Sequence, residues 1–566
     1  MGSIIKKKVK KYSYYYYVES KRINGKPKLV NQKYLGTAEK VLQLLQLAER
    51  QLSERVLYSD EAEFGAVALV YDIAARLGIV DIVDSVLPKR KQGASVGAYI
   101  LTAAINRTTD PSSKNGLQEW YSGTCLPYVT GLKPSLFTPQ NFWNNTCISA
   151  EEINRIEGIV LRKMIDAYQL DTTHIIYDAT NFFTYMDTKQ NSELSKRGNC
   201  KHKRNDLRIV GLSLMVSPEH AIPLLHNTYP GNRADAKEFP IMMERLKSQY
   251  ESITGKASEV TIVFDRGNNS EHNIELLESG VFKLSYVGGL KKNQAEELFL
   301  VSRDDYAPLV SPALKDQAAY RKEMKAFGRN VTAVIVHNPE LERGQMQGIL
   351  INKEKTNVKL LELQQRLMRR ASGEVTKGKK PTRESVSDAV DKILKTEYMS
   401  DVYRCEVVEL DGHIHITFEF REEQLERIRY DYLGKTALFT NRNDFTNEQI
   451  VTAYRSAWNV ESAFKQMKDS DHLAVRPIFH WTDEKIRVHI FTCVLAYRLC
   501  SLLIKELSDK GIKTSINKLI DEMAKIKRIH TFFDDENKPE KVESFTSGSE
   551  LAMQVDTIYD LKNKYS

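Results

Sequence analysis

Two short apolar runs in the middle of the chain each end in an aspartate, and this pattern constrains the fold more than any other feature. Residues 175–177 and 260–264 are rich in β-branched and aromatic side chains, which predicts two buried strands that end at Asp178 and Asp265. A carboxylate in this position lies at the edge of a sheet, where a metal ion can reach it. Glu461 adds a third acid far downstream.

Three carboxylates brought together by folding would make an oxygen-rich site that suits Mg²⁺ or Mn²⁺. Two such ions can activate an attacking oxygen and stabilise a leaving oxygen in phosphoryl transfer. A chain with this site is expected to be a polynucleotidyl enzyme. The alternative for any one aspartate after an apolar run is an ordinary turn or cap residue.

Length, charge and cysteine usage set broad limits. The 566 residues are too many for one compact core, and domain sizes predict about three or four units. The net charge, 82 − 74 = +8, permits nucleic-acid binding without indicating it. The six cysteines form no C-x-x-C pair, which argues against a zinc ribbon or a disulfide framework and fits a reducing cytosol. With no signal peptide and no apolar run of about 20 residues recognised, we expect a cytoplasmic protein that does not span a membrane.

The chain divides into six expected segments. We expect a multidomain α/β protein in which a mixed sheet with flanking helices is interrupted by an insertion. The segments are 1–57, a basic, tyrosine-rich β-hairpin region; 58–170, a helical DNA-binding domain; 171–290 and 433–510, the two parts of the catalytic core; 291–432, a β-rich insertion; and 511–566, a helical tail.

The first two segments carry the basic features outside the core. Asn24-Gly25 between two β-prone runs predicts a hairpin. Lysines beside tyrosines suit phosphate contacts and base stacking, although a solvated tail before an ordinary hairpin explains the same pattern. The basic loop that contains Lys89, Arg90 and Lys91 lies between helical stretches, which fits either DNA binding or an unrelated helical bundle.

A capping box predicts the helix that carries the third acid. Thr446 and Gln449 occupy the N-cap and N3 positions, so we expect one helix that begins there and continues through Glu461. Phe464 and Met467 are expected to face inward on this helix.

The spacing around Glu461 defines one stripe on that helix. Tyr454 and Lys468 lie two turns away on either side, and Ala457 and Lys465 lie one turn away. The stripe suits a metal-binding acid beside phosphate-binding cations. The alternative is an exposed helix with an ordinary Glu–Lys pair.

Taken together, these residues resemble the DDE transposases of bacterial insertion sequences, in the group with a Y-(2)-R-(3)-E-(6)-K signature. Tyr454, Glu461 and Lys468 fall on the Y, E and K positions, whereas Ala457 occupies the R position. Residues 177–181 and 264–267 resemble the segments that hold the two aspartates, and 476–480 and 486–490 resemble the C-terminal stretch of the group. The resemblance covers about residues 171–500.

The resemblance implies a ribonuclease-H-like core in which Asp178, Asp265 and Glu461 hold two Mg²⁺ (or Mn²⁺) ions. It also implies cleavage at the terminal inverted repeats of an element, followed by attack of the freed 3′-hydroxyl on double-stranded target DNA. Because an element has two ends and each catalytic core has one site, we expect a homodimer on paired ends. The residues expected to contact DNA are Tyr454, Arg455, Lys465, Lys468, Arg266, Arg476, Lys89, Arg90 and Lys91. A metal-dependent nuclease or resolvase with the same fold, a domesticated non-catalytic DNA-binding relative, and an unrelated soluble α/β protein remain as alternatives.

Overall fold

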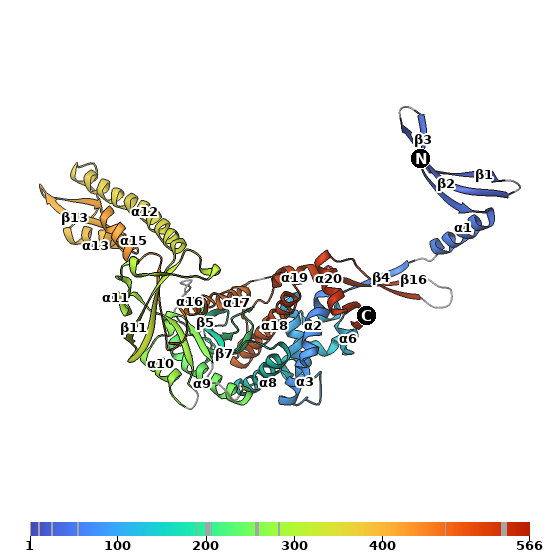
Figure 1. Cartoon of the computed structure of the whole chain (residues 1–566), viewed down its shortest axis with the longest axis horizontal. Helices are drawn as coiled ribbons and strands as arrows, with labels where there is room; N and C mark the ends of the chain where they lie inside the picture. The colour runs from blue at the N-terminus through green and yellow to red at the C-terminus, as the bar shows by residue number, and fades with distance from the viewer. Residues whose placement is uncertain are drawn as a thin grey trace. The chain divides into compact units, whose positions relative to one another are not determined.

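The computed structural model of the protein divides into two compact units (Figure 1). One unit comprises residues 1–72, 115–138 and 517–566, and the other comprises residues 73–114 and 139–516. The structure describes residues 2–9, 12–23, 26–53, 56–187, 189–198, 204, 206–254, 260–280, 283–469, 471–533 and 540–565.

A nine-stranded mixed sheet forms the centre of the larger unit. Five of its strands lie in the order β7-β6-β5-β8-β9. The pairs β7–β6 and β6–β5 are antiparallel, and the pairs β5–β8 and β8–β9 are parallel. This is the strand arrangement of a ribonuclease-H-like core, as expected. The strands are β5 (His174–Thr184), β6 (Arg208–Val216), β7 (Pro223–Pro230), β8 (Thr261–Phe264) and β9 (Ser285–Gly289).

β6 and β7 pair antiparallel and form a hairpin. The helix that connects β7 to β8 is α9 (Asp235–Thr254), and α10 (Glu271–Glu278) connects β8 to β9. Parallel strands need such crossover connections, and these helices pack on the sheet.

Four more strands extend the sheet beyond β9 in the order β15-β12-β11-β10, all antiparallel. They are β10 (Ala307–Pro308), β11 (Ala318–Ala326), β12 (Arg329–His337) and β15 (Lys435–Thr440), preceded by the short helix α11 (Glu296–Phe299). The first strands of the expected insertion therefore belong to the main sheet.

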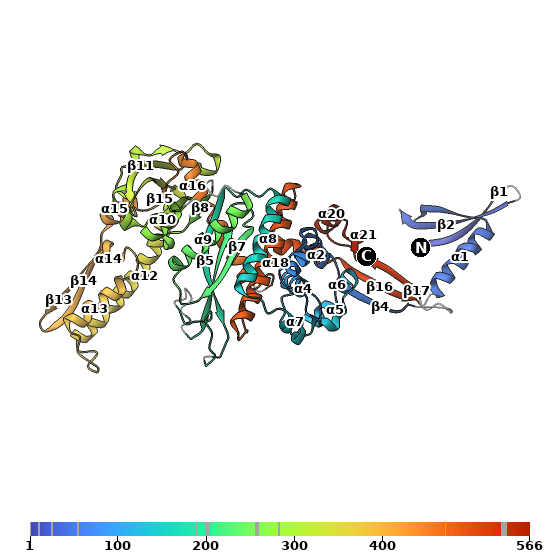
Figure 2. The ribbon, with the colours of Figure 1, turned by 90° about the horizontal axis from the view of Figure 1, so that it is seen from below.

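Residues 339–433, which include the rest of the expected insertion and one residue beyond it, are called the arm here (Figure 2). The arm holds more helix than a β-rich segment implies, because residues 339–371 form an unbroken 33-residue helix. Apolar side chains of α12, α13 and the β13–β14 hairpin form a core within the arm. The elements are α12 (Pro339–Ala371), α13 (Arg383–Leu394), α14 (Met399–Val402), β13 (Tyr403–Leu410), β14 (His413–Phe420) and α15 (Glu422–Asp431).

The turn of the β13–β14 hairpin is the one that its sequence predicts. Asp411 and Gly412 both adopt positive φ, 50° and 73°. Two consecutive residues with positive φ define the tight turn that matches the twist of antiparallel strands.

Buried charges join the helices of the larger unit to the sheet. Glu157 of α8 (Ala150–Tyr168) is fully buried and lies 2.8 Å from His226, 2.7 Å from Arg245 and 2.5 Å from Arg498. Burial by itself would raise the pKa of Glu157, but these neighbours outweigh it and hold the pKa well below its usual value. The cluster links α8, β7, α9 and α18 (Asp483–Asp509).

The helix α18 corrects one expectation from the sequence. It is long and apolar enough to cross a membrane by length and composition, although no such segment was recognised. In the structure 89% of its most apolar window is packed inside the protein, where it contacts α4 (Val96–Thr109) and β7.

The residues expected to form one helical domain, 58–170, fall in both units. In the larger unit they include part of α2 (Gly65–Leu77), α3 (Ile79–Val86), α4, α7 (Pro139–Asn145) and α8, and in the smaller unit α5 (Leu117–Ser122) and α6 (Leu126–Thr130). Their assignment to DNA recognition stays a prediction.

The smaller unit contains two three-stranded antiparallel sheets. The first is formed by β1 (Gly2–Val9), β2 (Tyr12–Ile23) and β3 (Lys26–Gly36) and is followed by α1 (Ala38–Ser53). The turn residues Asn24 and Gly25 lie outside the described residues. In the second sheet, β4 (Val56–Glu63) pairs with β16 (Lys527–Phe533), which pairs with β17 (Glu540–Phe545).

The C-terminal segment therefore differs from the expected helical tail. Besides α19 (Ile516–Met523), α20 (Glu550–Tyr559) and α21 (Leu561–Tyr565), it supplies two strands. The partner of β16 lies near the other end of the chain, so local sequence patterns do not reveal the pairing.

One buried lysine gives a pH-dependent prediction for stability. Burial, reinforced by the nearby positive charge of Arg107, lowers the pKa of Lys114 from 10.5 to about 7, and its Nζ has no hydrogen-bond partner in the described residues. Between these pH values the unfolded chain binds a proton that the folded chain does not, so folding stability rises with pH through this window. Lys114→Met removes the cost of burying the charge. We expect it to raise the melting temperature most below about pH 7 and progressively less toward about pH 10.

Thermal unfolding across this pH range measures the effect, with exposed Lys89→Met as the matched control. A Lys114→Met protein that is less stable than the wild type below neutral pH would show that the ammonium group is not buried unpaired.

Candidate functional site

A single pocket of about 390 Å³ in the larger unit is lined by all three acids predicted from the sequence. Asp178 lies on β5, Asp265 directly follows β8, and Glu461 lies on α17 (Trp458–Lys468). Asp178 is half-buried, whereas Asp265 and Glu461 are exposed to solvent. An open site with two exposed carboxylates is accessible to a large substrate.

Strand register explains why the two aspartates meet. β5 and β8 pair in parallel with Tyr177 opposite Phe264. Asp178 directly follows Tyr177, and Asp265 directly follows Phe264. The two aspartates therefore continue the same register at the same edge of the sheet. Adjacent strands lie about 4.8 Å apart, which brings residues at matching positions close together.

Glu461 is reached through two helices rather than the single helix expected. α16 (Asn447–Arg455) begins with the predicted capping box at Thr446 and Gln449, and the chain then turns at Ser456 and Ala457 before α17 begins. The two helices are thus separated by two residues, although both of these keep right-handed helical backbone angles. α17 packs on β5 and β6, with Phe464 and Met467 buried as predicted.

Tyr454 stands beside the second aspartate. Its hydroxyl donates a hydrogen bond to Asp265 Oδ1 over 3.4 Å. The pKa of Tyr454 is raised, mainly by burial and to a lesser extent by the negative charge of Asp265. The ring passes close to the backbone of β9, because a Cβ added to Gly289 would lie 2.5 Å from Tyr454 Oη and 2.9 Å from Cγ of Arg266. The absence of a side chain at Gly289 makes room for both residues.

Lys468 lies at the other end of α17. Its Nζ donates to Thr180 Oγ1 over 2.6 Å, and Thr180 lies two residues after Asp178 on β5. Residues two apart on a strand share a face of the sheet, so Lys468 reaches the face that carries Asp178. Arg476 donates to the backbone oxygen of Lys468 over 3.0 Å.

Arg455 lines the pocket although its helical position points away from the stripe of Glu461. Its guanidinium donates to the side chain of Gln317, and burial lowers the pKa of Arg455. Arg455 is the last residue of α16, directly before the break at Ser456 and Ala457.

The other predicted DNA contacts do not line this pocket. Lys465 is exposed on α17, and Lys89, Arg90 and Lys91 are exposed in the loop between α3 and α4. Trp458, to which no sequence pattern assigned a role, lines the pocket with 68% of its surface exposed. Sequence alone gave no reason to expect an exposed tryptophan here.

A family model described as "Transposase DDE domain" matches residues 169–499, more than half of the chain and a range that contains all three acids. The chain belongs to this family. Among solved structures, the transposase is similar to a cryo-EM structure of a piggyBac transposase synaptic complex with hairpin DNA. The two are 11% identical, with 81% of this chain and 77% of that chain covered and a TM-score of 0.37. A comparison with curated proteins found no match.

Transposases of this family generally use divalent metal ions. The carboxylates of this transposase have the oxygen chemistry that Mg²⁺ and Mn²⁺ prefer. They share a pocket, but in the part of the chain that the structure describes no three Asp, Glu, His or Cys side chains are grouped closely enough to hold one ion.

The fit between Gly289 and Tyr454 gives a testable prediction for the transposase. Gly289→Ala forces the new methyl group against the Tyr454 ring, so we expect a loss of about 1–3 kcal/mol in unfolding free energy, the usual cost of overpacking. DNA cleavage should fall as Tyr454 is displaced from Asp265. In a Tyr454→Ala background the ring is absent, and most of the stability cost should disappear.

Denaturant unfolding of the two single variants and the double variant measures this coupling. Gly267→Ala serves as the control, because an added Cβ there meets no atom within 4 Å. Equal costs of Gly289→Ala in both backgrounds would mean that Tyr454 does not occupy this space.

Proposed function

We propose that this transposase cuts the terminal inverted repeats of an insertion sequence and joins the freed ends to target DNA, with Asp178, Asp265 and Glu461 as its catalytic acids. The observation that carries the proposal is that these three acids, from two strand ends and a distant helix, line one pocket. In this proposal they hold two Mg²⁺ or Mn²⁺ ions, which would supply charge stabilisation for the attacking and leaving oxygens.

Each ion would take one or two of the carboxylates and complete its coordination with water and phosphate oxygens, as Mg²⁺ commonly does. This arrangement is compatible with acids that share a pocket without forming a closed group. Asp178 and Asp265 are placed by the sheet, while Glu461 approaches on α17.

The basic side chains around the pocket would bind the DNA backbone. Arg455 lines the pocket while Ala457 occupies the usual arginine position, so we assign the missing phosphate contact to Arg455. Tyr454, Arg266, Lys468, Arg476 and Lys465 complete the proposed contacts near the acids. The loop of Lys89, Arg90 and Lys91, with the N-terminal region, is proposed to help recognise the repeats.

The proposed reaction has two steps of the same kind. Water attacks the phosphorus at the end of the element and releases a 3′-hydroxyl, and this hydroxyl then attacks a phosphorus of the target DNA. In each step one P–O bond forms as another breaks, so no covalent bond to the protein is needed. The protein would act in the cytoplasm on nucleoid DNA.

Replacement of single acids tests the catalytic assignment. We expect Asp178→Asn, Asp265→Asn and Glu461→Gln each to reduce cleavage below detection while DNA affinity stays close to that of the wild type, because each removes an anionic oxygen ligand. Glu362→Gln, an exposed position on α12, is the matched control and should cleave normally.

The assay uses linear DNA that carries the sequences flanking the gene, with Mg²⁺ added or removed by chelation. Joined products distinguish a transposase from the alternative of a nuclease or resolvase, which would give cleavage only. Normal cleavage by any one acid variant would remove that residue from the site, and failure of all proteins to cleave would favour a non-catalytic DNA-binding relative.

The number of subunits is tested by mixing. An element has two ends and each chain has one such pocket among its described residues, so we propose a dimer on paired ends. In an equal mixture of wild type and Glu461→Gln, about a quarter of the dimers contain two active sites. Paired-end products should therefore fall to about a quarter, whereas independent subunits would retain about half.

A further inference from the structure

Seven basic side chains gather at the far end of the arm, around the end of α12 and the loop that leads to α13. Between residues 366 and 383 they are accompanied by one acid, Glu374, which gives 7 − 1 = +6. This group, called the basic tip, consists of Arg366, Arg369, Arg370, Lys377, Lys379, Lys380 and Arg383.

The charges of the basic tip are not neutralised by any acid among the residues that the structure describes. Six of the seven side chains are exposed, and Arg370 is half-buried. Across the described residues no carboxylate forms an ion pair with any of them, whereas elsewhere on the arm Lys353 pairs with Glu422 at 2.9 Å. Unpaired like charges repel one another, so an anionic partner would stabilise this surface.

The folded loop holds the basic tip in a concave shape. The guanidinium of Arg370 donates to the backbone oxygens of Lys377 and Gly378, the latter over 2.7 Å. A cavity of about 250 Å³ opens beside it, lined among others by Arg370, Thr376, Lys380 and His413. The cationic side chains of Arg370 and Lys380 are suited to the oxygens of a phosphate.

The other end of α12 lies at the catalytic pocket. Asn338, the N-cap of α12, and Leu341 in its first turn both line the pocket with the three acids. The helix has 33 residues, and a rise of 1.5 Å per residue gives a length of about 50 Å. One unbroken helix thus spans from the pocket to the basic tip.

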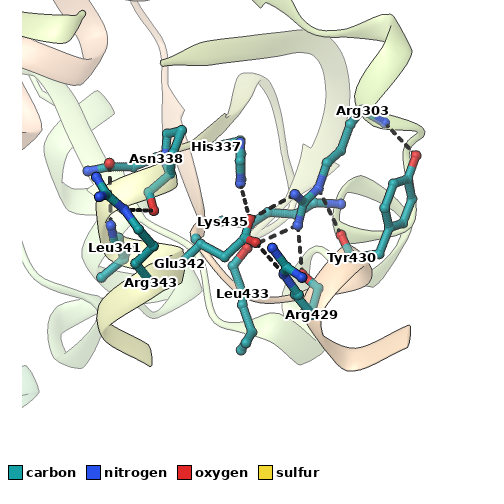
Figure 3. A network of polar contacts seen from close by, with 12 residues as sticks. Arg303, His337, Asn338, Leu341, Glu342, Arg343, Arg429, Tyr430, Leu433 and Lys435 are labelled. Carbon is teal, nitrogen blue, oxygen red and sulfur yellow. Dashed lines mark hydrogen bonds and ion pairs between the residues drawn. The ribbon is translucent and has the colours of Figure 1, made fainter. Parts of the chain in front are cut away.

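A cluster of charged side chains around the buried Glu342 holds the base of this helix (Figure 3). The Glu342 carboxylate accepts hydrogen bonds from the guanidinium groups of Arg303 (2.8 Å) and Arg429 (2.7 Å). Its other close contact is with the His337 ring, at 2.6 Å. Burial tends to raise the pKa of Glu342, but hydrogen bonds from Arg429, His337 and Arg303 outweigh it and lower the pKa to about 2. The carboxylate is therefore charged at neutral pH and keeps these contacts.

The two connections of the arm also lie side by side. The backbone N–H of Asn338, where the arm begins, donates to the backbone oxygen of Gly434, where it ends, over 2.8 Å. Gly434 has a φ of +73°, and an added Cβ would lie 2.8 Å from Cβ of Glu342. Together with the Glu342 contacts, this close approach holds the start of α12 against the sheet.

We propose that the basic tip binds the phosphate backbone of the same DNA duplex whose reacting phosphate enters the pocket, about 15 base pairs from that phosphate. The separation follows from the helix length of about 50 Å and the DNA rise of about 3.4 Å per base pair. The inference rests on the proposed function of the pocket. Its ligand is a duplex phosphate backbone, without regard to base sequence.

Duplex length provides the test. Substrates carry the reacting end with about 10 or about 25 base pairs of duplex, extended either into the element or into the flanking DNA. The wild type should bind the longer duplex more tightly on one of these two sides, and the side identifies which DNA the arm follows. The variant Lys377→Gln/Lys379→Gln/Lys380→Gln should lose this advantage, on the order of tenfold in affinity.

The salt dependence of binding gives a second measurement. For the long duplex, the slope of log affinity against log salt should become shallower by about 2–3 in the triple variant, because each lost lysine–phosphate contact contributes about 0.9. Cleavage of the short substrate should remain at the wild-type level. The matched control, Lys392→Gln/Lys510→Gln/Lys513→Gln, removes the same charge from exposed positions outside the basic tip and should keep the length effect.

The two proposals fail in different ways. If the triple variant retains the length effect and the salt slope of the wild type, the basic tip does not bind DNA, whatever the pocket does. If the acid variants cleave normally while the triple variant loses the length effect, the DNA contact stands and the assignment of the catalytic acids falls. Loss of the length effect in the control variant as well would also overturn the proposal, because it would show that overall charge and not the basic tip is responsible.

Discussion

The parallel pairing of β5 with β8 is the constraint on which the site depends. It aligns Tyr177 with Phe264, so that the residues after them, Asp178 and Asp265, leave the sheet together. A shift of one residue in this register would turn one aspartate to the opposite face, because side chains alternate along a strand. The apolar residues of the paired segments, 175–177 and 262–264, are completely or almost completely buried, which fixes the register. The burial of apolar side chains that stabilises the core therefore also holds the two aspartates in position.

The remaining walls of the pocket are built against this edge by elements from distant parts of the chain. α16 brings Tyr454 and Arg455, and α17 brings Glu461. Gly289 on β9 leaves the space that the Tyr454 ring occupies. These residues are far apart in the sequence, but they meet because each of their elements belongs to the same sheet or packs on it.

The arm connects with the pocket through the first turn of α12. Asn338 and Leu341 line the pocket, and Glu342 in the same turn is held by Arg303, His337 and Arg429. Since the contacts of Glu342 fix the start of the helix, they also set the direction in which its far end points. A contact between DNA and the basic tip would in this way be related geometrically to the position of the reacting phosphate.

The sequence by itself determined the features that depend on local patterns. Apolar runs predicted the strands that end at Asp178 and Asp265, and the capping box at Thr446 predicted the start of α16. It did not reveal the turn at Ser456 and Ala457, because both residues are compatible with a continuing helix. A helix as long as α12 was not expected within the β-rich insertion, since its largely polar sequence gives only a weak amphipathic signal.

Only the tertiary structure decided which distant segments meet. The pairing of β4 with β16, the joining of β11 and β12 to the main sheet, and the burial of α18 all depend on partners far away in the chain. The pocket follows the same rule: the sequence supplied three acids of suitable chemistry, and strand register and helix packing brought them to one place. Residue identity sets what a side chain can do, whereas the free energy of burying apolar surface between elements selects its neighbours.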